Sequence, residues 1–243
     1  RQMCIRDRLY IMRINKYLSA QGVCSRREAD RLLEAGRITV DGVTAMCGQQ
    51  VDDNSVICID GSRISDEKPQ DVLMAFNKPR GIVCTTTDNQ GKNNIVDYIG
   101  YDKRIYPVGR LDKDSDGLIL LTNNGEITDK ILRSVNGHEK EYVVKVNKKI
   151  TDTFLKNMAD GVYLKELDVT TKPCSISRIN NYTFRIILTQ GLNRQIRRMC
   201  QESGYKVESL TRVRIMNIEL GGLKIGEYRI IEGKEKTMLY ESL

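Results

Sequence analysis

Three carboxylates occupy alternating positions in the middle of the chain, at Asp112, Asp114 and Asp116. An apolar run over 117–122 follows them and has the composition of a buried strand. Burial and neighbouring charges can adjust a carboxylate for nucleophilic or acid–base work. The stretch is therefore a candidate catalytic loop. It is also compatible with a metal site or with a polar turn before a strand.

The same spacing reproduces the first half of an EF-hand calcium loop, with Asp112 at the first position and Gly117 at the sixth. The loop requires a bidentate glutamate at its twelfth position, and Asn123 stands there instead. The seven cysteines include no Cys-x-x-Cys pair, and His138 is the only histidine. We therefore expect no metal site, and the polar turn and the catalytic loop remain as alternatives.

A second distinctive segment is a predicted helix over 194–203, which follows a predicted strand over 182–188. At helical spacing, Arg194, Arg197 and Arg198 share one side of this helix. Between positions 185 and 214 the chain carries seven basic residues against two acidic ones. The basic residues are Arg185, Arg194, Arg197, Arg198, Lys206, Arg212 and Arg214. We interpret them as a basic patch that favours an anionic substrate.

The bulk composition indicates a globular protein. The 243 residues are 40% hydrophobic and 29% charged, enough to form a core in one large domain or in two smaller ones. The net charge of +7 favours an acidic partner only weakly. No apolar run approaches the roughly 20 residues of a membrane span, and the first eleven residues are too charged for a secretory signal. We therefore expect a cytoplasmic protein without membrane attachment.

The order of periodic segments predicts two domains joined by a short linker. The first contains two short helices followed by strands with Asp-Gly turns. Ser25 and Glu28 have the spacing of a capping box at the start of the second helix. The second domain contains many short strands and a few helices, including a strand expected over 82–87. The expected divisions are a non-native or disordered extension at 1–12, the small domain at 13–66, a linker at 67–71 and the large domain at 72–243.

Two motifs in the small domain are specific: Arg-Ile-Asn-Lys-Tyr-Leu at 13–18 and Gly-Val-Cys-Ser-Arg-Arg-Glu-Ala at 22–29. They resemble the alpha-L RNA-binding domain named after the fourth protein of the small ribosomal subunit. The resemblance implies that basic side chains on the helices contact RNA phosphates with little sequence selectivity. A solvated helix face is the alternative. The basic residues are Lys16, Arg26, Arg27, Arg31 and Arg37.

Four motifs follow one another in the large domain. They are Asn-Lys-Pro-Arg-Gly at 77–81, Gly-Arg-Leu-Asp at 109–112, Lys-Glu-Tyr at 140–142 and Gly-Leu-Asn-Arg-Gln-Ile-Arg-Arg-Met at 191–199. Together they resemble the pseudouridine synthases of the RsuA/RluB/RluE/RluF branch, and most closely the RluF type. The implied fold is α+β. The small N-terminal RNA-binding domain is joined to a catalytic domain with a mixed, mainly antiparallel β-sheet and flanking helices.

Pseudouridine synthases isomerise a uridine within RNA: the glycosidic bond breaks, the uracil turns, and it rejoins through carbon. The resemblance makes Asp112 the nucleophile or acid–base carboxylate and Arg197 the cation that keeps it ionised. A phosphate contact is the alternative for Arg197. Tyr142 is implied as the active-site tyrosine, which could stack the flipped base or assist proton removal. A position in the core is the alternative for Tyr142.

The remaining implied contacts are with RNA. Arg110 is expected to fill the gap that the flipped base leaves. Arg194 and Arg198 are expected to contact phosphates. Lys78 faces either the substrate or the surface, and we include it in the predicted RNA-binding set.

The resemblance implies no metal and no cofactor. The expected partner is large-subunit ribosomal RNA, bound by a monomer. One alternative is a transfer RNA as an additional substrate. A second is a non-catalytic RNA-binding or ribosome-assembly factor. The presence of Asp112, Tyr142 and Arg197 together favours the enzyme, because an inactive factor has no chemical need of them.

Overall fold

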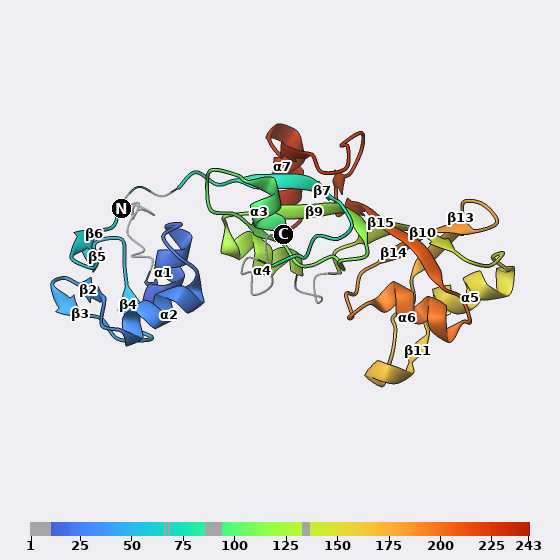
Figure 1. The fold of residues 1–243 in the computed structure, drawn as a ribbon, viewed down its shortest axis with the longest axis horizontal. Coiled ribbons are helices and arrows are strands. Elements are labelled where there is room, and N and C mark those ends of the chain that lie inside the picture. The colour runs from blue at the N-terminus through green and yellow to red at the C-terminus, as the bar shows by residue number, and fades with distance from the viewer. Residues whose placement is uncertain (1–10, 66, 68, 86–93, 133–136) are drawn as a thin grey trace, which may run out of the picture. The chain divides into compact units, whose positions relative to one another are not determined.

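The computed structural model describes residues 11–65, 67, 69–85, 94–132 and 137–243. The chain divides between Asp71 and Val72 into two compact units, called here the module and the sheet unit (Figure 1). Met12 pairs with Val51, so the prediction that residue 12 belongs to an extension is wrong. The rest of the predicted extension up to residue 10, and residue 68 of the predicted linker, lie outside the described residues.

The module consists of two helices and two small sheets around one core. The helices are α1 (Ile14–Ala20) and α2 (Arg26–Glu34), and their inward positions Ile14, Leu18 and Ala29 are fully buried. The sheets have the orders β3-β2-β5-β6 and β1-β4. The strands are β1 (Met12–Arg13), β2 (Ile38–Val40), β3 (Val43–Thr44), β4 (Gln50–Val51), β5 (Ile57–Ile59) and β6 (Ser62–Arg63).

Local side-chain chemistry sets the ends of these elements. The Ser25 hydroxyl accepts a hydrogen bond from Glu28 N at 3.1 Å, as the predicted cap requires. The Glu28 carboxylate accepts instead from Arg31, at 2.8 Å, one turn further along the helix. Asp41 and Gly42 have φ values of 52° and 81°, and they form the predicted tight turn between β2 and β3.

The sheet unit is built on nine strands, seven of which follow the order β13-β14-β10-β15-β9-β7-β17. Strand β16 pairs with β15, and β8 pairs with β9. These strands are β7 (Leu73–Lys78), β8 (Tyr106–Pro107), β9 (Asp116–Thr122), β10 (Lys140–Val146), β13 (Ser175–Arg178), β14 (Thr183–Leu188), β15 (Val207–Ile215), β16 (Ile218–Glu219) and β17 (Tyr228–Ile230). A separate pair is β11 (Tyr163–Leu164) and β12 (Val169–Thr170).

Helices cover the sheet in two groups (Figure 1). Side chains of α5 and α6 pack with β10, β14 and β15 in one core. Side chains of α4 and α7 pack on one face of β7 and β9, and those of α3 pack on the other. Because β7 and β9 are covered on both faces, their sequences read as continuous apolar runs. The helices are α3 (Ile95–Ile99), α4 (Gly125–Leu132), α5 (Asp152–Asp160), α6 (Gln195–Glu202) and α7 (Gly233–Glu241), with a 3-10 turn at Lys165–Leu167.

The strand predicted over 82–87 differs from what is found. Within its described part, Val83 makes a single bridge to Asn94, and no longer pairing includes residues 82–85. Residues 86 and 87 lie outside the described residues. No helix in the described ranges is long and apolar enough to span a membrane.

One strand contact in the sheet is decisive for the position of the acidic loop. Strands β9 and β15 are parallel, and Gly117 pairs with Arg212. A Cβ atom at Gly117 would lie 2.3 Å from Arg212 O, and the residue has φ of +103°. A glycine is therefore required for the two strands to approach here. This seam brings the loop that precedes β9 close to α6, which precedes β15.

Candidate active site

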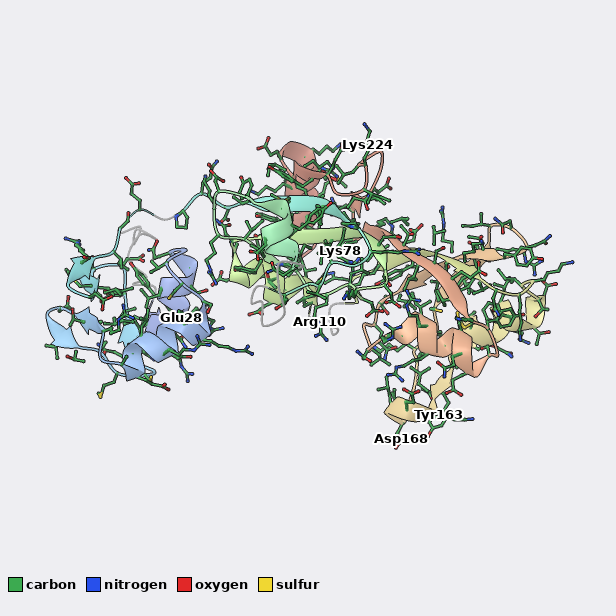
Figure 2. The ribbon with its side chains drawn as sticks, in the orientation of Figure 1. Glu28, Lys78, Arg110, Tyr163, Asp168 and Lys224 are labelled. Atoms are coloured by element: carbon green, nitrogen blue, oxygen red, sulfur yellow. The ribbon has the colours of Figure 1, made fainter. Side chains whose placement is uncertain are left out.

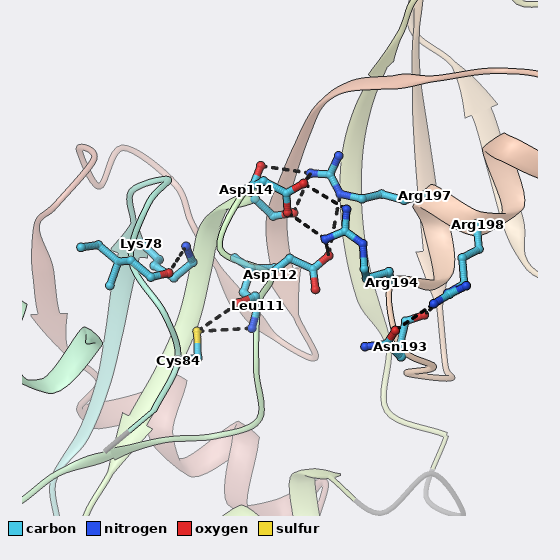
Figure 3. Close-up of polar contacts among 11 residues, drawn as sticks. Lys78, Cys84, Leu111, Asp112, Asp114, Asn193, Arg194, Arg197 and Arg198 are labelled. Carbon is cyan, nitrogen blue, oxygen red and sulfur yellow. Dashed lines mark hydrogen bonds and ion pairs between the residues drawn. The ribbon is translucent and has the colours of Figure 1, made fainter. Parts of the chain in front are cut away.

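Asp112 lies in the loop between β8 and β9, with its side chain 28% exposed. Two guanidinium groups face it from the start of α6 (Figure 3). The distance from Asp112 Oδ2 is 3.6 Å to Arg194 Nη1 and 3.7 Å to Arg197 Nε. These distances allow a charge–charge attraction but are longer than a hydrogen bond. The carboxylate therefore stays accessible to a ligand while the cations attract it.

Asp114 holds the first of these arginines. Its two carboxylate oxygens accept from Arg194 Nη1 and Nη2, each at 3.1 Å. These bonds lower the pKa of Asp114 and raise that of Arg194. Arg194 has a left-handed backbone, with φ of 50°, in the position that caps α6. That conformation is uncommon outside glycine, and here it directs the guanidinium at the acidic loop.

Arg197 is fixed more firmly than Arg194, with a side chain 14% exposed. Its Nη2 donates to Asp114 O and to Ser115 Oγ, both at 3.0 Å. Burial lowers the pKa of Arg197. The Nε atom is buried and has no hydrogen-bond partner in the described structure. A buried donor without a partner is costly, and this one lies next to the Asp112 carboxylate.

The third carboxylate, Asp116, is the first residue of β9, and its contacts are within the sheet unit. Asp116 accepts from Arg80 Nε at 2.8 Å and from the Thr211 hydroxyl across the seam between β9 and β15. The three carboxylates therefore face cations or a hydroxyl donor. In the part of the chain that the structure describes, no group of three or more His, Cys, Asp or Glu side chains could hold a metal ion. The loop lacks the arrangement of an EF-hand.

An open cleft of about 610 Å³ lies in front of Asp112. Its lining includes Arg110, Asp112, Lys140, Tyr142 and Arg212, and also the turn at 190–195. Tyr142 is half-buried: it packs against the core under β10 and also lines the cleft. The core position and the active-site position proposed for this tyrosine are thus compatible. Arg110, labelled in Figure 2, is exposed and also lines the cleft.

Lys78 has a different environment from the one predicted. Its side chain is fully buried, and Nζ donates to Pro79 O at 2.8 Å and to Ile82 O at 3.0 Å (Figures 2 and 3). Burial lowers the pKa of this lysine. The ammonium group supports a turn of the backbone and has no exposed surface for RNA. The prediction that Lys78 contacts RNA is therefore wrong.

Arg198 is also engaged inside the protein. Its guanidinium donates to Asn193 O at 3.0 Å and to Asn193 Oδ1 at 3.2 Å, and it forms an ion pair with Glu166. These contacts brace the turn that precedes α6. With its side chain 20% exposed, Arg198 contributes to the position of Arg194 and Arg197 rather than to a free basic surface.

The predicted basic patch is divided between the two faces of the sheet. Arg214 and Arg185 both form ion pairs with Glu141. Arg212 lies opposite Tyr142 and lines the cleft. Residues two apart on a regular strand share a face, but the register between β10 and β15 shifts at this point: Glu141 pairs with Arg214, whereas Tyr142 pairs with Arg212. This bulge at Val213 separates the two arginines, and no local pattern of residues indicates it.

The basic residues predicted in the module are mostly on its surface. Arg26, Arg27, Arg31 and Arg37 are exposed, and Lys16 is half-buried. Arg31 pairs with Glu28, and Arg37 pairs with Asp60. Arg26 and Arg27 occupy the first turn of α2, where the helix dipole disfavours cations. Their position is therefore better suited to an anionic ligand than to the stability of the helix.

The sheet, the module and the loop with its arginines define the class of protein. Residues 72–202 match the RNA pseudouridylate synthase family, and residues 12–57 match the S4 domain. The chain belongs to the RNA pseudouridine synthases, enzymes of the isomerase class, and it carries an RNA-binding S4 domain at its N-terminal end. The predicted family, activity and fold class are confirmed.

Individual relatives show which members of this class the chain resembles, and it is RluF-like. The chain is 49% identical over 231 residues to the dual-specificity RNA pseudouridine synthase RluF of Escherichia coli O6:H1, covering 95% of this chain and 79% of that protein. It is 32% identical over 233 residues to the ribosomal large subunit pseudouridine synthase B of Bacillus subtilis, covering 93% and 95%. A crystal structure of a pseudouridylate synthase has the same fold, with a TM-score of 0.68, 24% identity and coverage of 96% and 100%.

Proposed function

We propose that this enzyme converts a uridine of bacterial large-subunit ribosomal RNA into pseudouridine, with Asp112 as its catalytic carboxylate. The observation that carries the proposal is the position of Asp112. It lies at an open cleft, within 4 Å of Arg194 and Arg197 and with Tyr142 on the cleft wall. The names of relatives that act on the ribosomal large subunit support the choice of RNA.

The reaction breaks the C1′–N1 bond of uridine and forms a C1′–C5 bond. The proton on C5 leaves, and N1 gains one, so that no atom or electron is supplied from outside. Asp112 attacks or deprotonates the ribose, and the neighbouring guanidinium groups favour the ionised carboxylate that either step requires. The unpaired Nε–H of Arg197 is available to the carboxylate when it moves during the reaction.

The base must leave the RNA helix to reach this carboxylate, which costs a few kcal/mol. Tyr142 offers a ring on which the flipped uracil stacks, a contact that is worth about 1–3 kcal/mol. The exposed side chain of Arg110 fills the space that the base leaves. Tyr142 also lies in the cleft where its phenol can assist removal of the C5 proton.

The module binds the RNA outside the cleft, chiefly through phosphates. Arg26 and Arg27 are exposed at the positive end of α2, so two side chains and the helix dipole attract the same anion. Such contacts carry affinity without sequence information. We propose that the enzyme acts as a monomer, in the cytoplasm where ribosomes are assembled.

A second RNA substrate is also part of the proposal. The RluF relatives are named dual-specificity enzymes, and we propose that a transfer RNA uridine is the second target of this enzyme. An open cleft reached by a flipped base is compatible with more than one RNA, because the flanking contacts need not read sequence.

The test uses RNA with tritium at the uracil C5 position. The enzyme should release tritium from large-subunit ribosomal RNA, and a carbodiimide-blocked primer-extension map should place the new pseudouridine at one position. A parallel assay on transfer RNA tests the second substrate. Release from transfer RNA alone would contradict the ribosomal assignment, and release from neither RNA would contradict both.

A further inference from the structure

Two cations line the cleft beside Tyr142. Lys140 and Tyr142 are two residues apart on β10, so their side chains share a face of the sheet. Arg212 lies directly opposite Tyr142 on β15 and reaches the same face because of the bulge at Val213. All three line the cleft. A base stacked on Tyr142 therefore has one edge toward these two cations.

Both cations have unused hydrogen-bonding capacity. Arg212 is 4% exposed, and its Nε donates to Leu118 O at 2.6 Å. Its Nη2 is buried and has no partner in the described structure. The Lys140 ammonium donates to His138 O over a long 3.3 Å, and among the described residues it has no carboxylate partner. A buried donor such as Arg212 Nη2 is normally satisfied, so a ligand is expected to complete it.

The pair also carries an electrostatic cost that an anion would relieve. Burial and the positive charge of Arg212 both lower the pKa of Lys140. Two like charges in a partly desolvated cleft repel each other, and a negative charge placed beside them would be strongly favoured. The nearby carboxylates on β9 and β10 are committed elsewhere: Asp116 to Arg80, and Glu141 to Arg214 and Arg185.

We propose that Lys140 and Arg212 bind the carbonyl edge of the flipped uracil and stabilise the negative charge on the base when its glycosidic bond breaks. Cleavage of C1′–N1 leaves the electron pair on N1, from where it is delocalised onto the two carbonyl oxygens of uracil. Donors already directed at those oxygens stabilise the separated base more than the intact nucleoside. They also keep the base in place while it turns to present C5.

A phosphate contact does not explain Arg212. The side chain is almost completely buried in the wall of the cleft, whereas the backbone of a bound RNA follows the protein surface, so a backbone phosphate does not reach it. A base inserted into the cleft along Tyr142 lies beside this residue, because both side chains line the cleft. This inference rests on the proposed catalytic role of Asp112, and it gives a role to two residues for which the family resemblance implied none.

The test compares two methionine variants of the same strand. Lys140→Met keeps the apolar stem of the side chain and removes the charge. Lys145→Met is the matched control, because Lys145 is exposed at the other end of β10 and pairs with Glu208 at the surface. The single-turnover rate of glycosidic bond cleavage is measured as loss of the intact target nucleoside, on RNA containing uridine and on the same RNA with 5-fluorouridine at the target. Because fluorine occupies C5 and no proton can leave from there, only the cleavage step is compared between the two RNAs. Fluorine withdraws electrons and makes the base a better leaving group.

Loss of a charged hydrogen bond to the leaving base should lower the rate of Lys140→Met on uridine by about 10- to 100-fold. The loss should be several-fold smaller with 5-fluorouridine, because that base needs less stabilisation. The dissociation constant for RNA should change little, since phosphate contacts carry the affinity. Lys145→Met should match the unaltered enzyme on both RNAs. Arg212→Lys, which keeps a charge but shortens the reach, should show the same dependence on the leaving group.

Two outcomes would overturn the proposal. One is a rate for Lys140→Met that equals the rate for Lys145→Met. The other is an equal loss on both RNAs, which indicates a structural effect rather than leaving-group stabilisation. Failure of the proposed function is recognised separately, with Asp112→Asn: a fully active Asp112→Asn rejects the catalytic site itself. An inactive Asp112→Asn beside a fully active Lys140→Met rejects this inference alone.

Discussion

Two pairs of arginines in this enzyme show how differently one residue type can be used. In the module, Arg26 and Arg27 are exposed on the first turn of α2. In the sheet unit, Arg194 and Arg197 are held by Asp114 and its neighbours, and both face Asp112. The first pair is placed against the helix dipole, whereas the second is fixed by hydrogen bonds.

The two pairs differ in how firmly their side chains are held: Arg194 and Arg197 are hydrogen-bonded, whereas Arg26 and Arg27 are exposed. An exposed, hydrated cation attracts phosphates at long range and contributes affinity that falls with salt. A cation that hydrogen bonds hold within 4 Å of a carboxylate can stabilise the charge on that one group. It need not be reoriented during the reaction, so no further free energy is spent on placing it. We therefore expect substitutions in the module to change binding, and substitutions around Asp112 to change the rate of the bound complex.

Asp112→Asn should have the largest effect. The amide has no negative charge with which to attack or deprotonate the ribose, so the single-turnover rate should fall by at least about 1,000-fold. The dissociation constant for RNA should stay within a few-fold of its original value, because the phosphate contacts remain. Tritium release and a filter-binding assay measure the two quantities. A variant that turns over at the normal rate would remove Asp112 from the mechanism.

Arg197→Met should come next, with a loss of about 100-fold in the single-turnover rate. It removes the cation that is held beside Asp112 and leaves Ser115 Oγ without that donor. Arg197→Lys should recover part of the rate. It restores the positive charge, but an ammonium group cannot contact residues 114–115 and Asp112 with separate nitrogens as the guanidinium does. The matched change Arg27→Met in the module should leave the rate at saturating RNA unaltered. If Arg197→Met and Arg27→Met lowered the rate equally, the hydrogen-bonded arginines of the sheet unit would not differ in function from the exposed arginines of the module.

Tyr142→Phe should slow the reaction by about 10- to 100-fold and leave RNA binding intact. The ring that stacks the base is kept, and only the phenol that can assist proton transfer is lost. Rates are measured at saturating RNA, and the melting temperature controls for the fold. Unchanged kinetics would return Tyr142 to a purely structural position under β10, where it already packs against the core.

The double variant Arg26→Ala/Arg27→Ala should weaken RNA binding about tenfold and leave the rate of the bound complex unchanged. If both residues contact phosphates, the slope of log binding constant against log salt concentration should become shallower by about 1–2. The melting temperature should not fall, because both side chains oppose the helix dipole. A steep salt dependence identical to that of the unaltered enzyme would argue that α2 does not face RNA.

Asp114→Asn should have the smallest effect, seen in the pH dependence of stability. The bond from Arg194 lowers the pKa of Asp114 below its ordinary value of 3.8, so the ionised carboxylate stabilises the fold above that value. This contribution is lost as the pH falls toward the lowered pKa. At neutral pH the variant should melt about 1–3 °C lower, and the difference should vanish in acid. Asp129→Asn, on an exposed position of α4, is the control.

Sequence patterns predicted the local elements well where the cause is local. The apolar runs of β7 and β9, the Ser25 cap of α2 and the turn at Asp41–Gly42 all follow from neighbouring residues. The acidic loop and the helix of arginines were also identified as separate features. Their closeness in space was implied only by the resemblance to known enzymes, because it depends on the parallel pairing of β9 with β15.

Side-chain environments could not be predicted in the same way. Lys78 reads as a substrate-facing cation, yet its ammonium is buried on two backbone carbonyls. Arg198 reads as one of three equivalent arginines, yet it braces the turn at Asn193. Both outcomes depend on which carbonyls the fold brings within reach, and that is a property of distant segments.

The sequence by itself determined the chemistry available to this protein: a carboxylate, a tyrosine and a series of arginines, in the order typical of pseudouridine synthases, after an RNA-binding module. The tertiary structure decided which charges act together. A glycine at 117 allows β9 and β15 to meet, and a bulge at Val213 sends Arg212 into the cleft and Arg214 to the opposite face. Alternation along a strand is local, but a register shift exists only between two strands, and so the sequence of one strand cannot reveal it.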